Sequence, residues 1–251
     1  MPVIHTVIPT LRLSGVTKQI GGLLAVNGID LTVDHGEIVG LVGPNGAGKT
    51  TLLNIISGIT PPTAGNVMFC GEEITDLKSD RICRKGIAKT FQIAESFPNL
   101  TACECVMVGA LFGNRHSITM SDARDRAGEI LKYVGLPPAK IDTPTRNLNV
   151  VELKRVQLAR ALASDPKLLL LDELTTGLNP KESSEAIDLI KRIREQGRAI
   201  LIIEHVMSVI MGVSDRIVVL DHGEKIAEGQ PYEVVNNQQV IDTYLGDMSV
   251  F

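Results

Sequence analysis

The chain has 251 residues and a formal net charge of −4, with both signs of charge interspersed along it. Of its residues 44% are hydrophobic and only 3% aromatic, so a sizeable core can form and must be largely aliphatic. No basic stripe is present that would hold a nucleic-acid backbone, which excludes nucleic acid as an expected partner. No apolar run has the length of a membrane span, and the N-terminus lacks the pattern of a signal peptide. These features predict a soluble, cytoplasmic protein.

The first half of the chain predicts an antiparallel layer followed by a buried strand. Residues 1–10 have no clear period and are expected to form a loose extension. From Leu11 to Val33, short apolar stretches broken by glycines are typical of antiparallel strands joined by turns. Glu37–Val42 is a β-branched apolar run that predicts a buried strand. Gly65–Ile74 is expected to form a hairpin that returns to the antiparallel layer.

A segment that fits the phosphate-binding pattern G-x-x-x-x-G-K-[ST] without a mismatch follows the buried strand. Glycines let the backbone wrap an anion, and the predicted helix from Thr51 to Ser57 would offer free N–H groups to it. In this interpretation Lys49 meets the β- and γ-phosphates and Thr50 supplies a hydroxyl to Mg²⁺. The alternative is a glycine-rich turn that happens to precede a helix. The segment comprises Gly43, Pro44, Asn45, Gly46, Ala47, Gly48, Lys49, Thr50 and Thr51.

The second half of the chain alternates helices with apolar strands. Between Thr101 and Arg160 the apolar period is helical, with helices expected from Ser121 and over Asn149–Ala163, and we interpret this part as an inserted helical region. The strands Lys167–Asp172 and Ala199–Ile203 are separated by an amphipathic helix, Glu182–Gln196, which predicts an α/β fold with a parallel sheet. A hairpin over 216–227 and a helical tail to residue 244 are expected to follow. The cysteines Cys70, Cys83, Cys103 and Cys105 form no C-x-x-C pair, which favours reduced structural thiols over a metal site.

Further segments make residues 11–245 resemble the ATP-binding-cassette family of transporter ATPases. Asp172 and Glu173 stand at the end of the predicted strand LLLLD, where the family has its metal-binding aspartate and catalytic glutamate. Such an aspartate can hold Mg²⁺, and the adjacent carboxylate can polarise the attacking water. The alternative for this pair is an ordinary solvated strand end, which the intact phosphate loop disfavours.

Three other matches are weaker when each is taken alone. Gln92 in KTFQ matches the family's glutamine loop, which contacts Mg²⁺ or the water and touches the membrane partner, although such a glutamine is often just a surface residue. His205 in LIIEHVM matches the switch histidine that contacts the γ-phosphate, although a histidine after a strand is often a structural hydrogen-bonding group. The segment TTGLNP, residues 175–180, resembles the dimer-contacting loop.

Two segments depart from the family pattern. The signature usually written L-S-G-G-Q falls on residues 148–152, where Asn149, Val150, Val151 and Glu152 follow the leucine. The changes predict a weakened closed site, or alternatively an N-x-x-E capping arrangement that only starts a helix. The aromatic residue that usually stacks on adenine is replaced by Ile20, which covers a base face without π-stacking.

The finer resemblance is to the ATPases of branched-chain amino acid importers. It implies a P-loop NTPase fold with a RecA-like parallel-sheet core, an N-terminal antiparallel β-layer and an inserted α-helical subdomain at about residues 93–160 of one cassette domain, 11–251. It also implies ATP and Mg²⁺ as ligands, transmembrane permease subunits, a second ATPase subunit that is identical or a sister chain, and indirectly a solute-binding protein. The chain would lie on the inner face of the cell membrane. An alternative is a nucleotide-dependent assembly switch that drives no transport, and a P-loop kinase is disfavoured by Glu173, Gln92 and His205.

Overall fold

A mixed sheet forms the centre of the molecule, which is described here from a computed structural model over residues 8–90, 97–113 and 118–247. The order of its strands is β10-β9-β3-β8-β7-β6, and all neighbours are parallel except β10, which pairs antiparallel with β9. Every residue of β3, β7 and β8 is buried, as expected of strands covered on both faces. The strands are β3 (Ile38–Val42), β6 (Ile87–Lys89), β7 (Leu168–Asp172), β8 (Ala199–Ile203), β9 (Arg216–Asp221) and β10 (Glu224–Gly229).

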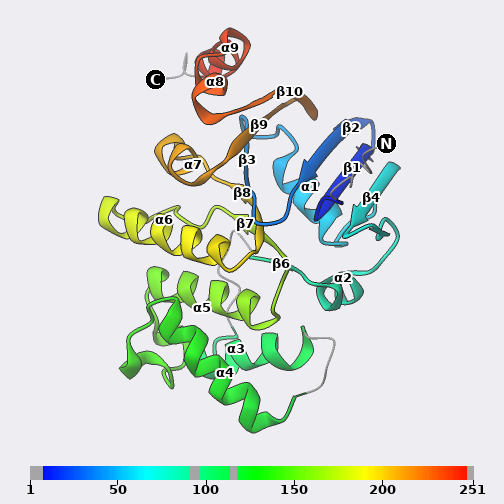
Figure 1. Ribbon diagram of the computed structural model, residues 1–251. Helices are drawn as coiled ribbons and strands as arrows, with labels where there is room; N and C mark the ends of the chain where they lie inside the picture. The colour runs from blue at the N-terminus through cyan, green and yellow to red at the C-terminus, as the bar shows by residue number, and fades with distance from the viewer. Residues whose placement is uncertain (1–7, 91–96, 114–117, 248–251) are drawn as a thin grey trace, which may run out of the picture.

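An antiparallel sheet with the order β2-β1-β4-β5 lies on one side of this core (Figure 1). Its inward side chains share one aliphatic cluster with helix α1 and with one face of the central sheet. Helix α1 therefore lies between two layers, which fixes the start of this helix beside the end of β3. The elements are β1 (Leu11–Ile20), β2 (Leu23–Val33), α1 (Lys49–Ile56), β4 (Ala64–Phe69) and β5 (Glu72–Glu73).

The helices α3, α4 and α5 pack on one another and form a separate group below the sheets in Figure 1. Helix α6 lies next to α5 in Figure 1, and the second aliphatic cluster joins these helices to the central sheet. The remaining helices are short or close the C-terminal end. The helices are α2 (Ser79–Lys85), α3 (Ala102–Phe112), α4 (Met120–Tyr133), α5 (Val150–Ala163), α6 (Pro180–Glu195), α7 (Met207–Val213), α8 (Pro231–Val235) and α9 (Gln238–Asp247), with 3₁₀ turns at Pro138–Lys140 and Thr145–Asn147.

The predicted α/β architecture, with its antiparallel layer and helical region, is confirmed, and several expected element ends are wrong by one or two residues. Helix α1 begins at Lys49 and not at Thr51, and α4 begins at Met120 and not at Ser121. Helix α6 begins at Pro180 and not at Glu182. Asn179 caps it, since Asn179 Oδ1 accepts from the Glu182 N–H at 3.0 Å and Glu182 Oε2 accepts from the Asn179 N–H at 2.9 Å. Proline fits the first helical position because its missing N–H would have no partner there. No helix in the described part of the chain is long and apolar enough to cross a membrane.

Candidate functional site

The phosphate-binding segment leaves the central sheet at the end of β3 and is tightly enclosed by neighbouring strands. Gly43 has a φ of 148°, and a Cβ there would lie 2.0 Å from the carbonyl oxygen of Leu220 on β9. Gly48 has a φ of 98°, and its Cβ would lie 2.3 Å from the carbonyl oxygen of Ala25 on β2. Both positions therefore require glycine. The path of the loop is fixed by strands of both sheets.

Lys49 is the first residue of α1, and its side chain turns back over the loop. Only 6% of Lys49 is exposed, and its Nζ donates to the carbonyl oxygens of Gly43 at 2.6 Å and Pro44 at 2.8 Å. Burial lowers the pKa of Lys49, and the nearby carboxylates of Glu173 and Asp172 oppose this shift. The first helical bond runs from the Leu52 N–H to the Gly48 carbonyl, so the earlier N–H groups of α1 precede the helical ladder. This arrangement suits an anion.

Asp172 ends β7, which is separated from β3 by β8 in the sheet order, and is 2% exposed. Its Oδ2 lies 3.6 Å from Lys89 Nζ, and its Oδ1 is buried with no hydrogen-bond partner in the described structure. Burial raises the pKa of Asp172, while the charge of Lys89 lowers it. Lys89 Nζ also donates to Asn54 Oδ1 on α1 at 2.6 Å. A buried carboxylate oxygen without a partner is typical of a cation ligand.

Sequence reasoning missed Lys89 as a residue of this site. A signal was available, because Lys89 ends the short strand before Thr90, and β6 pairs in parallel with β7. The carboxyl ends of parallel strands meet at one edge of a sheet, so Lys89 is expected at the edge that holds Asp172. Only the strand order, with β6 next to β7, brings the two side chains together.

Glu173 follows β7 in a left-handed backbone conformation with a φ of 52°, which for a non-glycine residue costs about 1–2 kcal/mol. Its N–H donates to the carbonyl of Ile203 on β8 at 2.9 Å. Its Oε1 lies 2.7 Å from His205 Nε2, and the Thr176 hydroxyl approaches its Oε2 at 3.4 Å. The Glu173 side chain is 11% exposed and that of His205 is 44% exposed. Backbone strain of this kind is concentrated at functional sites.

The structure therefore brings Lys49, Asp172, Glu173 and His205 to one edge of the central sheet, as the spacing predicts. Thr50 lies beside Lys49 in the first turn of α1 and is exposed. Ile20 ends β1 at the hairpin before β2 and is 57% exposed. Gln92 lies outside the described residues. Of the remaining positions, Asn45, Gly46 and Ala47 lie between β3 and α1, and Thr51 lies in the first turn of α1.

Comparison with known proteins identifies the family of the chain. A family model described as "ABC transporter" matches residues 26–176, and one described as "Branched-chain amino acid ATP-binding cassette transporter" matches residues 224–248. The chain belongs to the ATP-binding-cassette (ABC) transporter family. As a member of this family, the chain binds and hydrolyses ATP.

Two curated relatives match this cassette over nearly its whole length. The high-affinity branched-chain amino acid transport ATP-binding protein BraF of Pseudomonas aeruginosa is 37% identical over 255 residues, which cover 95% of this chain and 98% of the relative. LivG of Escherichia coli, named in the same words, is 37% identical over 252 residues with the same shares covered.

Solved structures of other cassettes share the fold. The ADP conformation of an ATP-binding cassette of an ABC transporter superposes with a TM-score of 0.86 at 27% identity, covering 95% of this chain and 99% of that one. A dimeric cassette in a post-hydrolysis state bound to ADP and Pi superposes with a TM-score of 0.81 at 31% identity, covering 88% and 98%.

The altered signature of this cassette forms a capping box at the start of α5. Asn149 Oδ1 accepts from the Glu152 N–H at 2.9 Å, and Glu152 Oε2 accepts from the Asn149 N–H at 2.9 Å. Glu152 Oε1 lies 3.7 Å from Lys140 Nζ. The capping arrangement predicted as one alternative is thus present, and the carboxylate of Glu152 is occupied at the helix start. Val150 is 58% exposed in the same turn.

Proposed function

We propose that this cassette hydrolyses ATP to power a separate membrane permease that imports branched-chain amino acids or a related small polar solute. The observation that carries the hydrolytic part is the 2.7 Å contact between Glu173 and His205 beside the phosphate loop. The choice of solute is supported by the subgroup match at residues 224–248 and by the names of BraF and LivG. These matches favour transport over an assembly switch.

The side chains at the end of β7 fit a magnesium ion. Asp172 offers a buried oxygen without a hydrogen-bond partner, and carboxylate and hydroxyl oxygens are the ligands that Mg²⁺ takes beside nucleotide phosphates. We assign Asp172 and Thr50 to this ion, with Gln92 as a third ligand from the family resemblance. When bound, Mg²⁺ neutralises negative charge on the β- and γ-phosphates.

The chain's own groups divide the reaction between them. Lys49 places its ammonium against the phosphates, in exchange for the loop carbonyls that it contacts in this structure. Glu173 polarises the attacking water and accepts its proton, because it is the carboxylate next to the metal ligand. His205 donates to Glu173 Oε1 and orients that carboxylate, and as the switch histidine of the family it contacts the γ-phosphate.

We propose that two cassettes close over ATP, with the signature segment of one covering the phosphate loop of the other. Val150 and Val151 stand in place of the glycines that would let the backbone approach the γ-phosphate, between the capping residues Asn149 and Glu152. We therefore propose a sister ATPase as partner, whose own signature completes the site at Lys49. Restoring the pattern with Asn149→Ser, Val150→Gly, Val151→Gly and Glu152→Gln tests this idea. A rise in ATP-dependent dimerisation or hydrolysis would support an impaired signature, and unchanged values would contradict it.

We propose that the permease binds in an apolar groove of about 450 Å³ between α2, α3 and α5. Phe97 and Phe112 line it and are 47% and 67% exposed, and Arg160 lies over the ring of Phe97 at 5.9 Å. Lys89 lines the same groove and also contacts Asp172, so the groove adjoins the site directly. On this proposal the cassette works at the inner face of the membrane, attached through its permease.

The proposal is tested in vesicles that contain the permease, the solute-binding protein and this cassette with its partner ATPase. We expect ATP-dependent uptake of radiolabelled leucine, isoleucine or valine, together with phosphate release that the loaded binding protein increases. Nucleotide-driven assembly without phosphate release would support the switch instead. Uptake of a different solute class would overturn only the choice of solute.

A further inference from the structure

Lys154 makes an unusual set of contacts from the first turns of α5. Its Nζ donates to three main-chain carbonyl oxygens, those of Glu173 at 3.1 Å, Leu174 at 2.9 Å and Thr176 at 2.6 Å. An ammonium has three donors, so all of them are directed to one short segment. This segment, residues 173–176, begins with the glutamate assigned to the attacking water. Lys154 therefore binds the main chain of the site and not a carboxylate.

The same segment is fixed from the opposite side by β8 and the residue that follows it. The Glu173 N–H donates to the Ile203 carbonyl, and Glu204 accepts from the Thr175 N–H at 2.6 Å and from the Thr175 hydroxyl at 2.8 Å. Thr175 and Glu204 are both buried. The segment is thus held between β8 and α5, with Lys154 as the polar contact from the α5 side.

Apolar packing does not complete the contact between α5 and this segment. A cavity of about 510 Å³ opens between α5 and α6, and Val151, Lys154 and Leu158 line it opposite Leu174 and Leu178. Leu174 itself is buried in the aliphatic cluster, but on the cavity side the hydrogen bonds of Lys154 supply the directed contact to the main chain of residues 173–176. Half-burying an ammonium also costs desolvation, which lowers the pKa of Lys154. An apolar side chain at this position would avoid that cost.

We propose that Lys154 is a positioning residue for catalysis, which holds the backbone of residues 173–176 so that the Glu173 carboxylate stays against His205. The left-handed conformation of Glu173 is strained, and a cation on its carbonyl oxygen stabilises it. Since Lys154 belongs to α5, the placement of Glu173 depends on how α5 packs in the same subunit. This inference rests on the proposed role of Glu173.

The test compares Lys154→Met with Lys154→Arg in the full chain. Methionine keeps the apolar stem and removes the donors, so we expect kcat to fall by about 10-fold or more, as for a misplaced catalytic group. The dissociation constant for ATP should change by less than two-fold, because Lys154 does not contact the phosphate loop. Arginine keeps donors for the carbonyls and should recover most of the lost kcat. Lys132→Met, an exposed lysine on α4, is the matched control and should leave both constants unchanged.

A double-mutant cycle separates positioning from a structural role. If Lys154 acts through Glu173, adding Lys154→Met to Glu173→Gln should leave the residual single-turnover rate within two-fold. An equal fold-loss in both backgrounds, or a fall in kcat matched by loss of folded protein in thermal unfolding, would overturn the proposal. Should Lys154→Met not fold, Lys154→Leu also removes the donors and serves in the same cycle. Full turnover in Glu173→Gln alone would instead refute the proposed function.

Discussion

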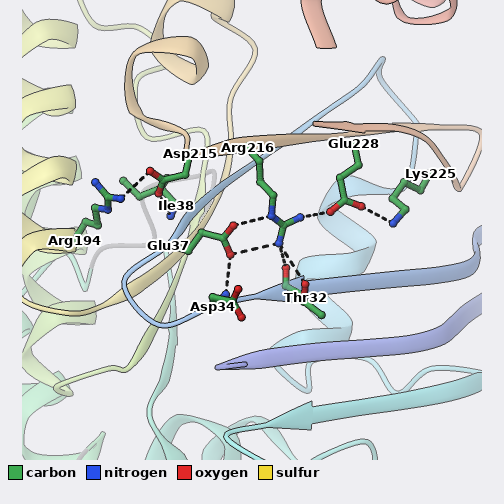
Figure 2. A network of polar contacts seen from close by, with 9 residues as sticks. All are labelled: Thr32, Asp34, Glu37, Ile38, Arg194, Asp215, Arg216, Lys225 and Glu228. Atoms are coloured by element: carbon green, nitrogen blue, oxygen red, sulfur yellow. Dashed lines mark hydrogen bonds and ion pairs between the residues drawn. The ribbon is translucent and has the colours of Figure 1, made fainter. Parts of the chain in front are cut away.

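The two ends of the central sheet use charged residues in opposite ways. At the amino end, Arg216 begins β9 and donates to Glu37 at 2.7 Å, to Glu228 on β10 and to the Thr32 carbonyl on β2 (Figure 2). Lys225 Nζ also donates a hydrogen bond to Glu228 Oε2 (Figure 2). Each charge in this amino-end network has an opposite charge or a polar partner. The network joins the antiparallel sheet to the central sheet.

A second pair extends the amino-end network toward the helices. Arg194 at the end of α6 lies 2.7 Å from Asp215, whose other oxygen accepts from the Ile38 N–H at 2.8 Å (Figure 2). At the carboxyl end, by contrast, Lys49 contacts loop carbonyls, Asp172 keeps a buried oxygen without a partner, and Glu173 is strained. Charges that are compensated within the chain stabilise the fold, whereas incompletely compensated ones are available to a ligand.

The largest expected effect is the loss of ATPase activity when a single residue at the carboxyl end is changed. Glu173→Gln removes the proton acceptor, because an amide neither accepts a proton from water nor polarises it strongly. The ATPase rate should fall by about 10²-fold or more, while ATP binding is retained. Steady-state phosphate release and calorimetric titration with MgATP measure the two quantities. Glu228→Gln at the amino end is the matched control, and its folded protein should keep the wild-type rate. Turnover within a few-fold of wild type in Glu173→Gln would remove Glu173 from its role.

The converse change, Arg216→Met, removes the centre of the amino-end network. It leaves Glu37 and Glu228 without their guanidinium, and the Arg216 side chain is only 18% exposed. We expect the free energy of unfolding to fall by about 2 kcal/mol, discounted for the partial exposure of the carboxylates. The ATPase rate per folded molecule should not change. Urea unfolding checks the first statement, and a lower kcat at full folding would show that the two ends are coupled.

Whether a contact at either end of the sheet can be predicted from the sequence depends on how close its residues are in the chain. The phosphate loop and the Asn149–Glu152 capping pair were predicted, since each is complete within a few residues. The apolar runs of β7 and β8 likewise predicted buried strands. Asp172 and Glu173 were assigned from the family resemblance, which has such a pair at the end of a buried strand.

The contacts that sequence reasoning missed join residues far apart in the chain. Lys89 meets Asp172 only because β6 pairs with β7, and Arg216 meets Glu37 only because β9 pairs with β3. Lys154 reaches Glu173 through the packing of α5 against the following loop. Sequence reasoning left the strand order unspecified, and a lysine or arginine in a sequence carries no sign of its partner.

A smaller effect tests whether the start of α5 stabilises the fold, like the amino-end network, or binds the ligand, like the carboxyl end. Asn149→Ala removes one half of the capping box, and we expect about 1 kcal/mol of lost stability, the usual value for an N-cap. The ATP affinity of the isolated cassette should stay unchanged, because the capping contacts are internal to α5. Val150→Ala, in the same turn but exposed, is the control. A clear loss of ATP affinity in Asn149→Ala would place this side chain with the ligand-binding groups of its own subunit.

The smallest expected effect is a pH dependence at the carboxyl end. Burial raises the pKa of Glu204, and the hydrogen bonds from Thr175 oppose this rise only in part. The folded state then binds the proton more readily than the unfolded chain does. The stability that this group contributes is therefore complete below its unfolded pKa and is lost as the pH rises through its folded pKa.

Comparing wild type with Glu204→Gln across the acidic range isolates this contribution, because glutamine does not titrate. The stability difference, wild type minus variant, should decrease as the pH rises. Glu104 gives the opposite sign, since its hydrogen bonds from Thr101 lower the pKa of Glu104 and its contribution is lost as the pH falls. Urea unfolding of wild type, Glu204→Gln and Glu104→Gln at matched pH values should therefore give two slopes of opposite sign. Two slopes of the same sign would mean that burial of Glu204 does not outweigh its hydrogen bonds from Thr175. Glu204 would then be a compensated group, like the carboxylates at the amino end.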